Sequence, residues 1–335
     1  MTVIEDRKSN IRVRFTNNAI YLNSKDIGIL TFNRKGKFIN KIGNIGRGPG
    51  EYMIYLRFCV DDKSGRVYVA DMKKVIKVFS RTGQFLRSFQ LAEYGDVIEN
   101  IAFYNSLIFI QYGIQFKSAD YEWIICDTLG NLVKKQSRHL PEFNANWGGN
   151  NGIYIFENRL FYYNSFTDTV FSVIPDLSEK PSFIISPGEH RYPRSNISMK
   201  QFMSNNFLDL AKIFETDRFY ILRYRYNQSC LALIDKHSHE SFLIDLKLTN
   251  NNYLDGIENN IDGGQFFIPE DYFTENGREY IVGIIYPHQI KAVVASKEFK
   301  DSTPKYPEKK EKLIKLAEGL KDTDNPVLVL VRLKQ

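Results

Sequence analysis

The chain has 335 residues, of which 43% are hydrophobic and 25% charged, and this composition excludes a disordered polypeptide. The formal net charge of +6 is divided among separate lysine and arginine clusters, and no nucleic-acid-binding motif accompanies them, so we expect no nucleic acid as a partner. The sequence contains no run of about 18 apolar residues, so we also expect no transmembrane segment.

Aromatic residues make up 14% of the chain, with 25 Phe and 20 Tyr, which favours half-buried β-strands. The three cysteines, Cys59, Cys126 and Cys230, each lie in an apolar run and are expected to be small buried side chains. Their odd number and the absence of a C-x-x-C motif argue against a disulfide framework or a structural zinc site.

Four short β-rich runs separated by turn residues recur along the chain. The first set reads IRVRF, AIYLN, GILTFNRKG and KFINKIG, and the clearest one, Leu56–Gln90, reads LRFCVDD, GRVYVAD, KVIKVFS and RTGQFLRSFQ. The third reads NIAFYN, SLIFIQY, WIICDTLG and NLVKKQS, the fourth IYIFEN, RLFYYN, TVFSVIPD and PSFIIS, and the fifth AKIFETD, RFYILRYRY, CLALIDKHS and ESFLIDLKL. A sixth set begins with GGQFFIPE and EYIVGIIY and resumes at NPVLVLVRLK, one strand short. Four strands in about 35 residues form one antiparallel blade.

The sequence therefore predicts an all-β fold, a six-bladed β-propeller of four-stranded antiparallel blades in a single domain of residues 1–335. We expect Thr2–Asp6 to complete the sixth blade by pairing with Val327–Leu333, so that the N- and C-terminal strands close the ring. The interruption of the last blade, about residues 287–325, predicts a helical insertion. One helix should place Leu313, Ile314, Leu316, Ala317 and Leu320 on one face, and another should cover Gln289–Phe299.

The segment from Gly36 to Asp71 resembles a known family. The run Gly46-Arg47-Gly48-Pro49-Gly50-Glu51-Tyr52, followed by Phe58-Cys59-Val60-Asp61 and Val67-Tyr68-Val69-Ala70-Asp71, is similar to the NHL-like bacterial six-bladed β-propeller family, as is the closing segment that begins at Asp324. The resemblance implies an exported, often lipid-anchored protein of undefined role, located in the periplasm or at the outer membrane. The leader and lipobox cysteine of that family are not present in this sequence, so a lipid anchor would lie outside it, and a cytoplasmic location is the alternative.

Nearly all of the long connections between the predicted strands belong to one class. They are residues 43–55, 138–152, 187–206 and 249–263 and the insertion after Tyr286, whereas the turns inside the predicted hairpins are short. Because alternate connections of a four-stranded blade lie at opposite ends of its strands, we expect one elaborated face, and long loops on a rigid scaffold commonly carry binding residues. The candidate binding residues on this face are Arg47, Glu51, Tyr52, His139, Trp147, His190, Arg191, Tyr192, Arg194, Asp255 and Asp262.

Two functions remain open at this point. The first is a non-catalytic module that binds a polar ligand, a glycan, a peptide or an envelope protein, because no motif nominates a nucleophile with its base. The second is a lactonase-like propeller hydrolase or lyase with a divalent cation at the mouth of the central channel, for which His139, His190, Glu51 and Asp262 would be the material. No cofactor is expected, although the Asn- and Asp-rich segment Thr249–Asp262 keeps a calcium-type cation as an alternative.

Overall fold

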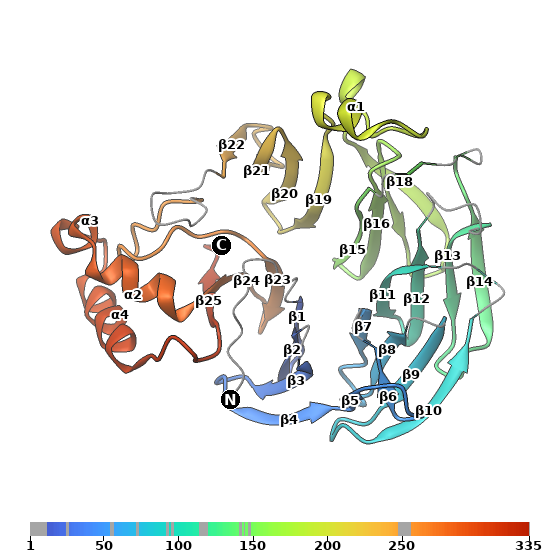
Figure 1. The fold of residues 1–335 in the computed structure, drawn as a ribbon, viewed down its shortest axis with the longest axis horizontal. Coiled ribbons are helices and arrows are strands. Elements are labelled where there is room, and N and C mark those ends of the chain that lie inside the picture. Colours follow the sequence, from blue (N-terminus) through green and yellow to red (C-terminus); the bar gives the residue numbers. More distant parts are fainter. Residues whose placement is uncertain are drawn as a thin grey trace. The chain divides into compact units, whose positions relative to one another are not determined.

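The computed structural model describes residues 12–24, 27–53, 57–71, 74–91, 94, 97–113, 120–140, 143, 145–146, 149–246 and 256–334. Within these residues the chain forms six successive antiparallel sheets, drawn in Figure 1, five with four strands and the last with three. Each sheet is a meander whose strands pair in chain order. The fold is the predicted six-bladed β-propeller, and the sheets are called blades one to six.

The strands of the first five blades match the predicted runs. Blade one contains β1 (Arg12–Phe15), β2 (Ala19–Ser24), β3 (Gly28–Asn33) and β4 (Phe38–Ile42), and blade two contains β7 (Arg57–Val60), β8 (Val67–Asp71), β9 (Val75–Phe79) and β10 (Phe85–Gln90). Blade three contains β11 (Ile98–Tyr104), β12 (Leu107–Tyr112), β13 (Tyr121–Cys126) and β14 (Leu132–Ser137). Blade four contains β15 (Asn151–Phe156), β16 (Arg159–Asn164), β17 (Thr169–Val173) and β18 (Glu179–Ile184). Blade five contains β19 (Asp209–Glu215), β20 (Phe219–Tyr226), β21 (Gln228–Asp235) and β22 (Ser241–Asp245). The short strands β5 (Asn44–Ile45) and β6 (Glu51–Tyr52) pair in parallel between blades one and two.

Side-chain acceptors fix the tight turns before the last strand of blades one and three. In blade three the Asp127 carboxylate accepts hydrogen bonds from the backbone amides of Leu129 and Asn131, and Gly130 adopts a positive φ of 98° that a side chain would disfavour. Asn33 accepts from two backbone amides in the same way in blade one. These contacts explain why the turn residues repeat along the sequence and set the strand register.

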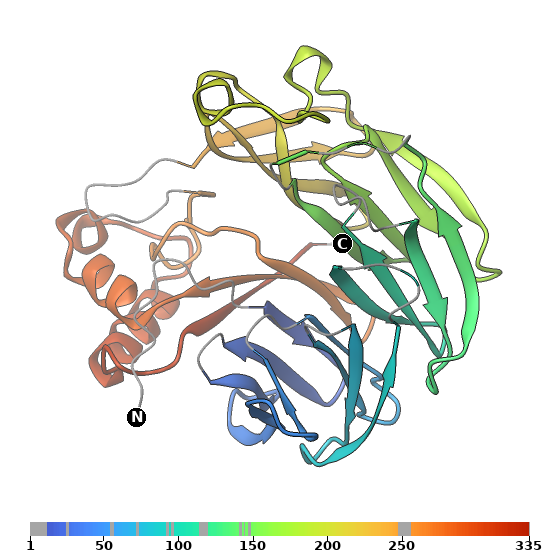
Figure 2. The ribbon, with the colours of Figure 1, turned by 45° about the vertical axis from the view of Figure 1, so that its right-hand side comes forward.

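Apolar side chains on facing blades form the core. Tyr21, Ile29, Phe58 and Phe79 belong to the cluster between blades one and two, which lie side by side in Figure 2. Equivalent clusters lie between blades two and three and between blades three and four. The three cysteines are buried free thiols, as predicted, and burial raises the pKa of the Cys126 thiol to about 12.

The chain divides into two compact parts at Ile213 and Phe214, within β19. The N-terminal part holds blades one to four, and the C-terminal part runs from Phe214 through blade six. The strand predicted for Thr2–Asp6 lies outside the described residues, so ring closure and a single domain of residues 1–335 stay predictions.

The first strand of blade six lies later than predicted. Blade six contains β23 (Asp271–Glu275), β24 (Arg278–Ile285) and β25 (Val327–Arg332), whereas GGQFFIPE contributes only an isolated bridge between Phe267 and Ile257. Pro269 has no amide hydrogen to donate to a sheet ladder, and the strand begins just after it. The prediction that residues 263–270 form this strand was therefore wrong.

The predicted helical insertion in blade six is confirmed. It contains α2 (Pro287–Ala295), α3 (Lys297–Asp301) and α4 (Pro307–Gly319), which Figure 1 shows on the side of β25. Ile290 and Ala317 pack with Ile285, and Leu313 and Leu320 line the same cluster. Leu316, predicted on this face, is exposed instead, because Leu313, Ala317 and Leu320 form the packed stripe and Leu316 lies at the edge of that stripe. None of the helices in the described ranges has the length and apolar character needed to cross a bilayer.

Candidate functional site

Two long connections of the N-terminal part pack together. Residues 138–150 link blade three to blade four, and residues 185–208, with the 3-10 helix η1 (Gly188–His190) and α1 (Met199–Ser204), lead from blade four to β19. They share an aromatic cluster, which consists of Ala145, Phe166 and Tyr192 with Leu140, Phe143, Phe202 and Phe207 against them. We call the described residues of these two connections the long-loop surface. The described residues of the two connections therefore pack against one another around a shared apolar cluster.

Polar contacts anchor the long-loop surface to blade four. The Arg191 guanidinium makes a two-pronged ion pair with Asp168, and the Arg194 guanidinium donates to the backbone carbonyl of Phe166. Asp168 and Phe166 belong to the turn between β16 and β17. The Asn146 side chain joins the two loops by pairing with the backbone of Ile197 in both directions, at 2.8 and 3.1 Å.

Replacing Arg191 with methionine should loosen this anchor. Both members of the pair are partly exposed, so we expect a loss of about 1 kcal/mol in local stability. This corresponds to roughly fivefold faster trypsin cleavage after Lys200 under native conditions. Arg159→Met, which removes an exposed ion pair with Glu157 in the same blade, is the matched control. Equal cleavage rates in the two variants would contradict the anchoring role.

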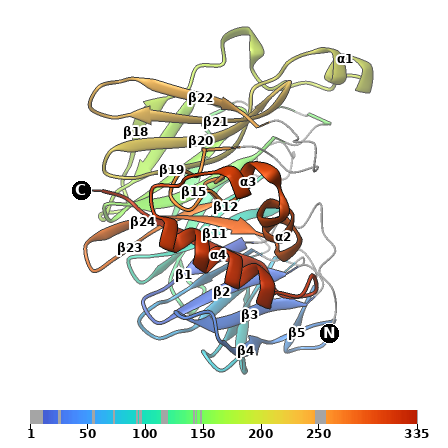
Figure 3. The ribbon, with the colours of Figure 1, turned by 90° about the vertical axis from the view of Figure 1, so that its left-hand side faces the viewer.

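Helix α1 presents two methionines to solvent. Ser198 caps the helix by accepting from the Gln201 amide, while the Gln201 side chain accepts from the Ser198 amide. Met199 and Met203, one turn apart, are 60% and 74% exposed. Figure 3 shows α1 projecting beyond the strands of blade four. Flexible, polarisable methionine side chains are frequent at protein-binding surfaces.

A second group of polar residues lies where blade three faces blade four. His139 Nε2 lies 2.7 Å from Glu179 Oε1, and the His139 ring stacks on Phe171 with centroids 4.2 Å apart. Glu179 also accepts from the Tyr162 hydroxyl and, at 3.0 Å, from Trp123 Nε1. Glu122, 1% exposed, accepts from the Asn164 side chain and from the His139 backbone amide.

A β-bulge places Glu122 in this group. The pairing of β13 with β14 shifts between Tyr121 and Trp123, so Glu122 is the extra residue and its side chain can turn toward blade four. Burial raises the pKa of Glu122 to about 7, and the nearby His139 opposes this shift. The hydrogen bond to Glu179 raises the pKa of His139. Burial alone would raise the pKa of Glu179, but its hydrogen bonds from His139 and Tyr162 outweigh burial and lower it.

The side chains of this group form a hydrogen-bond network in which Glu179 and His139 already have partners within the protein. The Glu179 carboxylate accepts from three different side chains, and its histidine partner is held by stacking as well as by the ion pair. Among the residues that the structure describes, no group of three or more His, Cys, Asp or Glu side chains is placed to hold a metal ion.

Of the three residues predicted from the first long loop, one is exposed and two stabilise the loop itself. Arg47 is exposed. The Glu51 carboxylate accepts from the Gly48 amide at 2.9 Å and thereby closes its own loop. Tyr52 is fully buried, where its hydroxyl donates to the Ile42 carbonyl and accepts from the Ile29 amide, so it supports the loop and offers no surface to a ligand.

The other predicted residues that the structure describes lie in different parts of the protein. Tyr192 is buried in the aromatic cluster, and the His190 carbonyl accepts from the Leu208 amide. In the C-terminal part the Asp262 carboxylate accepts from the Asn259 side chain and the Gly264 amide within its own loop. Trp147 and Asp255 lie outside the described residues.

Two members of the His139 group, Glu122 and Glu179, were not predicted as site residues. Glu122 carried a signal, since a carboxylate within the apolar run Tyr121–Cys126 requires a buried partner. No sequence signal marked Glu179, because it lies in a polar segment of the kind that is usually exposed. Only the pairing of β17 with β18 brings it to His139.

Comparison with known structures supports the fold alone. A Bacteroides fragilis protein described as a "putative exported protein" aligns with a TM-score of 0.66 at 17% identity, over 98% of this chain and 91% of that chain. Virginiamycin B lyase from Staphylococcus aureus aligns with a TM-score of 0.46 at 9% identity, over 83% of this chain and 78% of that chain, a likeness too weak to bear on activity. No curated protein matches the sequence.

The family assignment rests on the sequence. The model of one family matches residues 8–332, which is nearly the whole chain and includes all six blades. The chain therefore belongs to the family described as a domain of unknown function, DUF4934.

Proposed function

We propose that the protein is a non-catalytic binding module of the cell envelope that contacts a peptide segment of a partner protein through the long-loop surface. The observation that carries this proposal is the aromatic cluster of the long-loop surface, against which Phe202 of α1 packs while Met199 and Met203 stay exposed. A preformed surface loses little conformational entropy on binding, which favours recognition of a partner.

The location in the envelope has two supports. The sequence resembles an NHL-like family of mostly exported proteins, and the Bacteroides fragilis protein with the same fold carries the description "putative exported protein". Separation of the cells that make this protein into cytoplasmic and envelope fractions tests the location, and recovery in the cytoplasm would contradict it.

The binding proposal is tested with a displayed peptide library. We expect the purified protein to select peptides rich in apolar residues, and the double variant Met199→Glu, Met203→Glu to bind them at least about tenfold more weakly, because charges replace the central apolar contacts. Both methionines are solvent-exposed, so the variant should keep the thermal stability of the wild type.

A matched control distinguishes binding at the long-loop surface from nonspecific hydrophobic binding elsewhere on the protein. Leu129 is 64% exposed on the tight turn before β14, at the other end of its blade, and Leu129→Glu removes the same kind of exposed apolar side chain. This variant should bind the selected peptides as the wild type does. If Leu129→Glu weakens binding as much as the double variant does, or if the library yields no binder, the proposal fails.

A further inference from the structure

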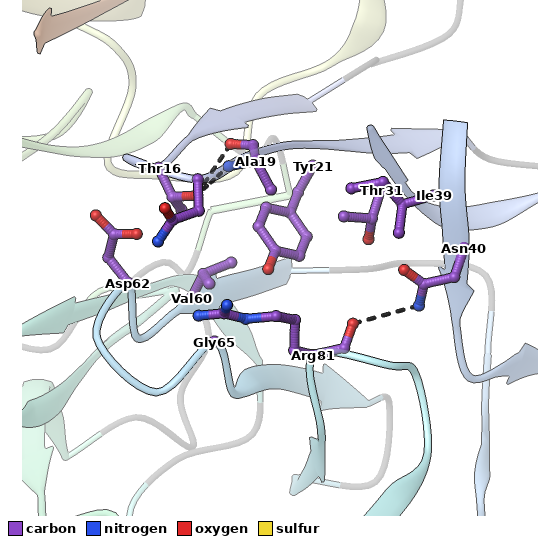
Figure 4. Close-up of a pocket in the computed structure, with 11 residues that line it drawn as sticks. Thr16, Ala19, Tyr21, Thr31, Ile39, Asn40, Val60, Asp62, Gly65 and Arg81 are labelled. Carbon is purple, nitrogen blue, oxygen red and sulfur yellow. Dashed lines mark hydrogen bonds between the residues drawn. The ribbon is translucent and has the colours of Figure 1, made fainter. Parts of the chain in front are cut away.

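A pocket of about 150 Å³ lies between blades one and two, at the ends of the strands opposite to the long connections. Its rim comes from short turns, namely Thr16–Asn18 of blade one and the turns of blade two that contain Asp62 and Arg81. Figure 4 shows the lining residues. None of them belongs to the long-loop surface or was predicted as a site residue.

Strand register brings three polar side chains of blade one together in this pocket. Tyr21 on β2 pairs with Thr31 on β3, and Thr31 pairs with Asn40 on β4, so the three lie in one row across the sheet. A β-bulge at Ile39 directs both Ile39 and Asn40 to the pocket lining. Figure 4 shows Tyr21 and Thr31 pointing into the space that Arg81 borders.

Two polar atoms of this row are buried without a hydrogen bond. Thr31 is 1% exposed, and neither its hydroxyl oxygen nor the side-chain oxygen of Asn40 has a partner among the described residues. A buried polar group without a partner costs about 1–3 kcal/mol. A ligand in the pocket that supplies the missing partners would remove this cost.

The exposed residue Arg81 borders the pocket, and its guanidinium makes no contact with another charged side chain of the described residues. The side chain of Arg81 lies over Gly65, whose positive φ of 72° and lack of a Cβ make room for it, since a Cβ there would lie 2.3 Å from Arg81 Nε. Within the described part of the chain no hydrogen bond or ion pair engages the Arg81 guanidinium, and only its backbone carbonyl accepts, from Asn40 Nδ2. The neighbouring Asp62 is already held by the backbone amide of Asn17.

We propose that this pocket binds a small hydroxylated carboxylate, with its carboxylate on Arg81 and its hydroxyl groups on Thr31 and Asn40. The planar guanidinium fork matches a carboxylate. The Thr31 hydroxyl can donate or accept, whereas the side-chain oxygen of Asn40 requires a donor such as a ligand hydroxyl. Burial raises the pKa of the Tyr21 hydroxyl, which therefore stays protonated as a further donor.

The charge and the volume of the pocket limit the class of ligand that it can bind. Asp62 offsets the charge of Arg81 in the lining, which disfavours a dianionic phosphate, while a neutral polyol would gain nothing from the charge of the guanidinium. A cavity of this volume has room for about five water molecules, which is close to the size of a three-carbon hydroxy acid or of the acid end of a sugar acid whose remainder extends into solvent.

Calorimetry and ligand-observed NMR test the proposal with D-glycerate and D-glucuronate as probes. Glycerol lacks the carboxylate, propionate lacks the hydroxyl groups, and inorganic phosphate is the alternative anion. We expect at least one of the two acids to bind with a Kd of about 1 mM or lower, at least about tenfold tighter than glycerol, propionate or phosphate. Binding of glycerate indicates a hydroxy acid, and binding of glucuronate alone indicates a sugar acid. Failure of both acids to bind, or equal binding of any of the three comparison compounds, would overturn the proposal.

Variants locate the binding in this pocket. Arg81→Gln should abolish the affinity for the acid, and Arg66→Gln, which alters an exposed arginine outside the lining, should leave it unchanged. Thr31→Val keeps the side-chain shape and removes the unpartnered hydroxyl. It should weaken binding about fivefold while the melting temperature stays the same or rises. Loss of stability with unchanged affinity in Thr31→Val, or retained affinity in Arg81→Gln, would contradict the assignment.

Discussion

Replacement of Trp123 by alanine is expected to lower the free energy of unfolding by about 4 kcal/mol. Trp123 is fully buried between blades three and four, with its ring centroid 5.4 Å from that of Phe109 and 6.3 Å from that of Tyr162. The substitution leaves a cavity in this cluster and removes one of the three donors to Glu179. Urea unfolding followed by tyrosine fluorescence or circular dichroism measures the change.

Leu129→Ala provides the reference for this experiment, because Leu129 is exposed on the neighbouring turn of blade three. It should change the unfolding free energy by less than about 0.5 kcal/mol. A loss below about 2 kcal/mol for Trp123→Ala would mean that the interface between blades three and four contributes less to stability than its burial indicates.

The stability of the N-terminal part is expected to fall by about 3 kcal/mol between pH 4.5 and pH 7.5. Glu122 has its pKa raised by burial from 4.5 to about 7, so the folded state holds the proton more tightly than the unfolded state. Its contribution is therefore complete below about pH 4.5 and is lost as the pH rises through 7. His139 acts in the same direction, because its raised pKa gives stability that is present below pH 6.5 and lost above its folded pKa.

Unfolding curves at half-unit pH steps measure this profile, and Glu122→Gln identifies its source. The amide keeps the shape and the acceptor for Asn164 but cannot ionise, so the fall should be reduced by at least half, leaving the contribution of His139. Glu157→Gln, at an exposed carboxylate of blade four, should keep the wild-type profile. A profile that Glu122→Gln leaves unchanged would show that other groups cause the pH dependence.

Local patterns were sufficient to predict the strands of blades one to five. Alternating apolar residues and turns such as Asp127–Asn131 act over a few residues and repeat in each blade. The first strand of blade six was misplaced because the aromatic pair Phe266-Phe267 has strand character, while Pro269 limits pairing. Leu316 was misplaced for a similar reason. The apolar face of a helix is wider than the part of it that packs against the rest of the protein, and Leu316 lies in the exposed part.

The polar sites depended on contacts that a sequence pattern does not contain. His139 was found because it lies in a long connection, but its partner Glu179 comes from a different blade. Thr31, Asn40 and Arg81 were missed because they lie on two strands of blade one and a turn of blade two, and only register and packing place them together. Tyr52 and Tyr192 were expected as ligand contacts, since composition alone does not distinguish a loop aromatic that packs inward from one that faces solvent.

Because all three native thiols are buried, they should react little with thiol reagents, so an introduced cysteine can be labelled selectively. A single cysteine introduced in place of Met203, on the exposed side of α1, would be the one accessible sulfhydryl among the described residues. A photoactivatable crosslinker attached there would join covalently to whatever polypeptide settles on the helix, and the same reagent at Leu129 would report on the other end of the blades.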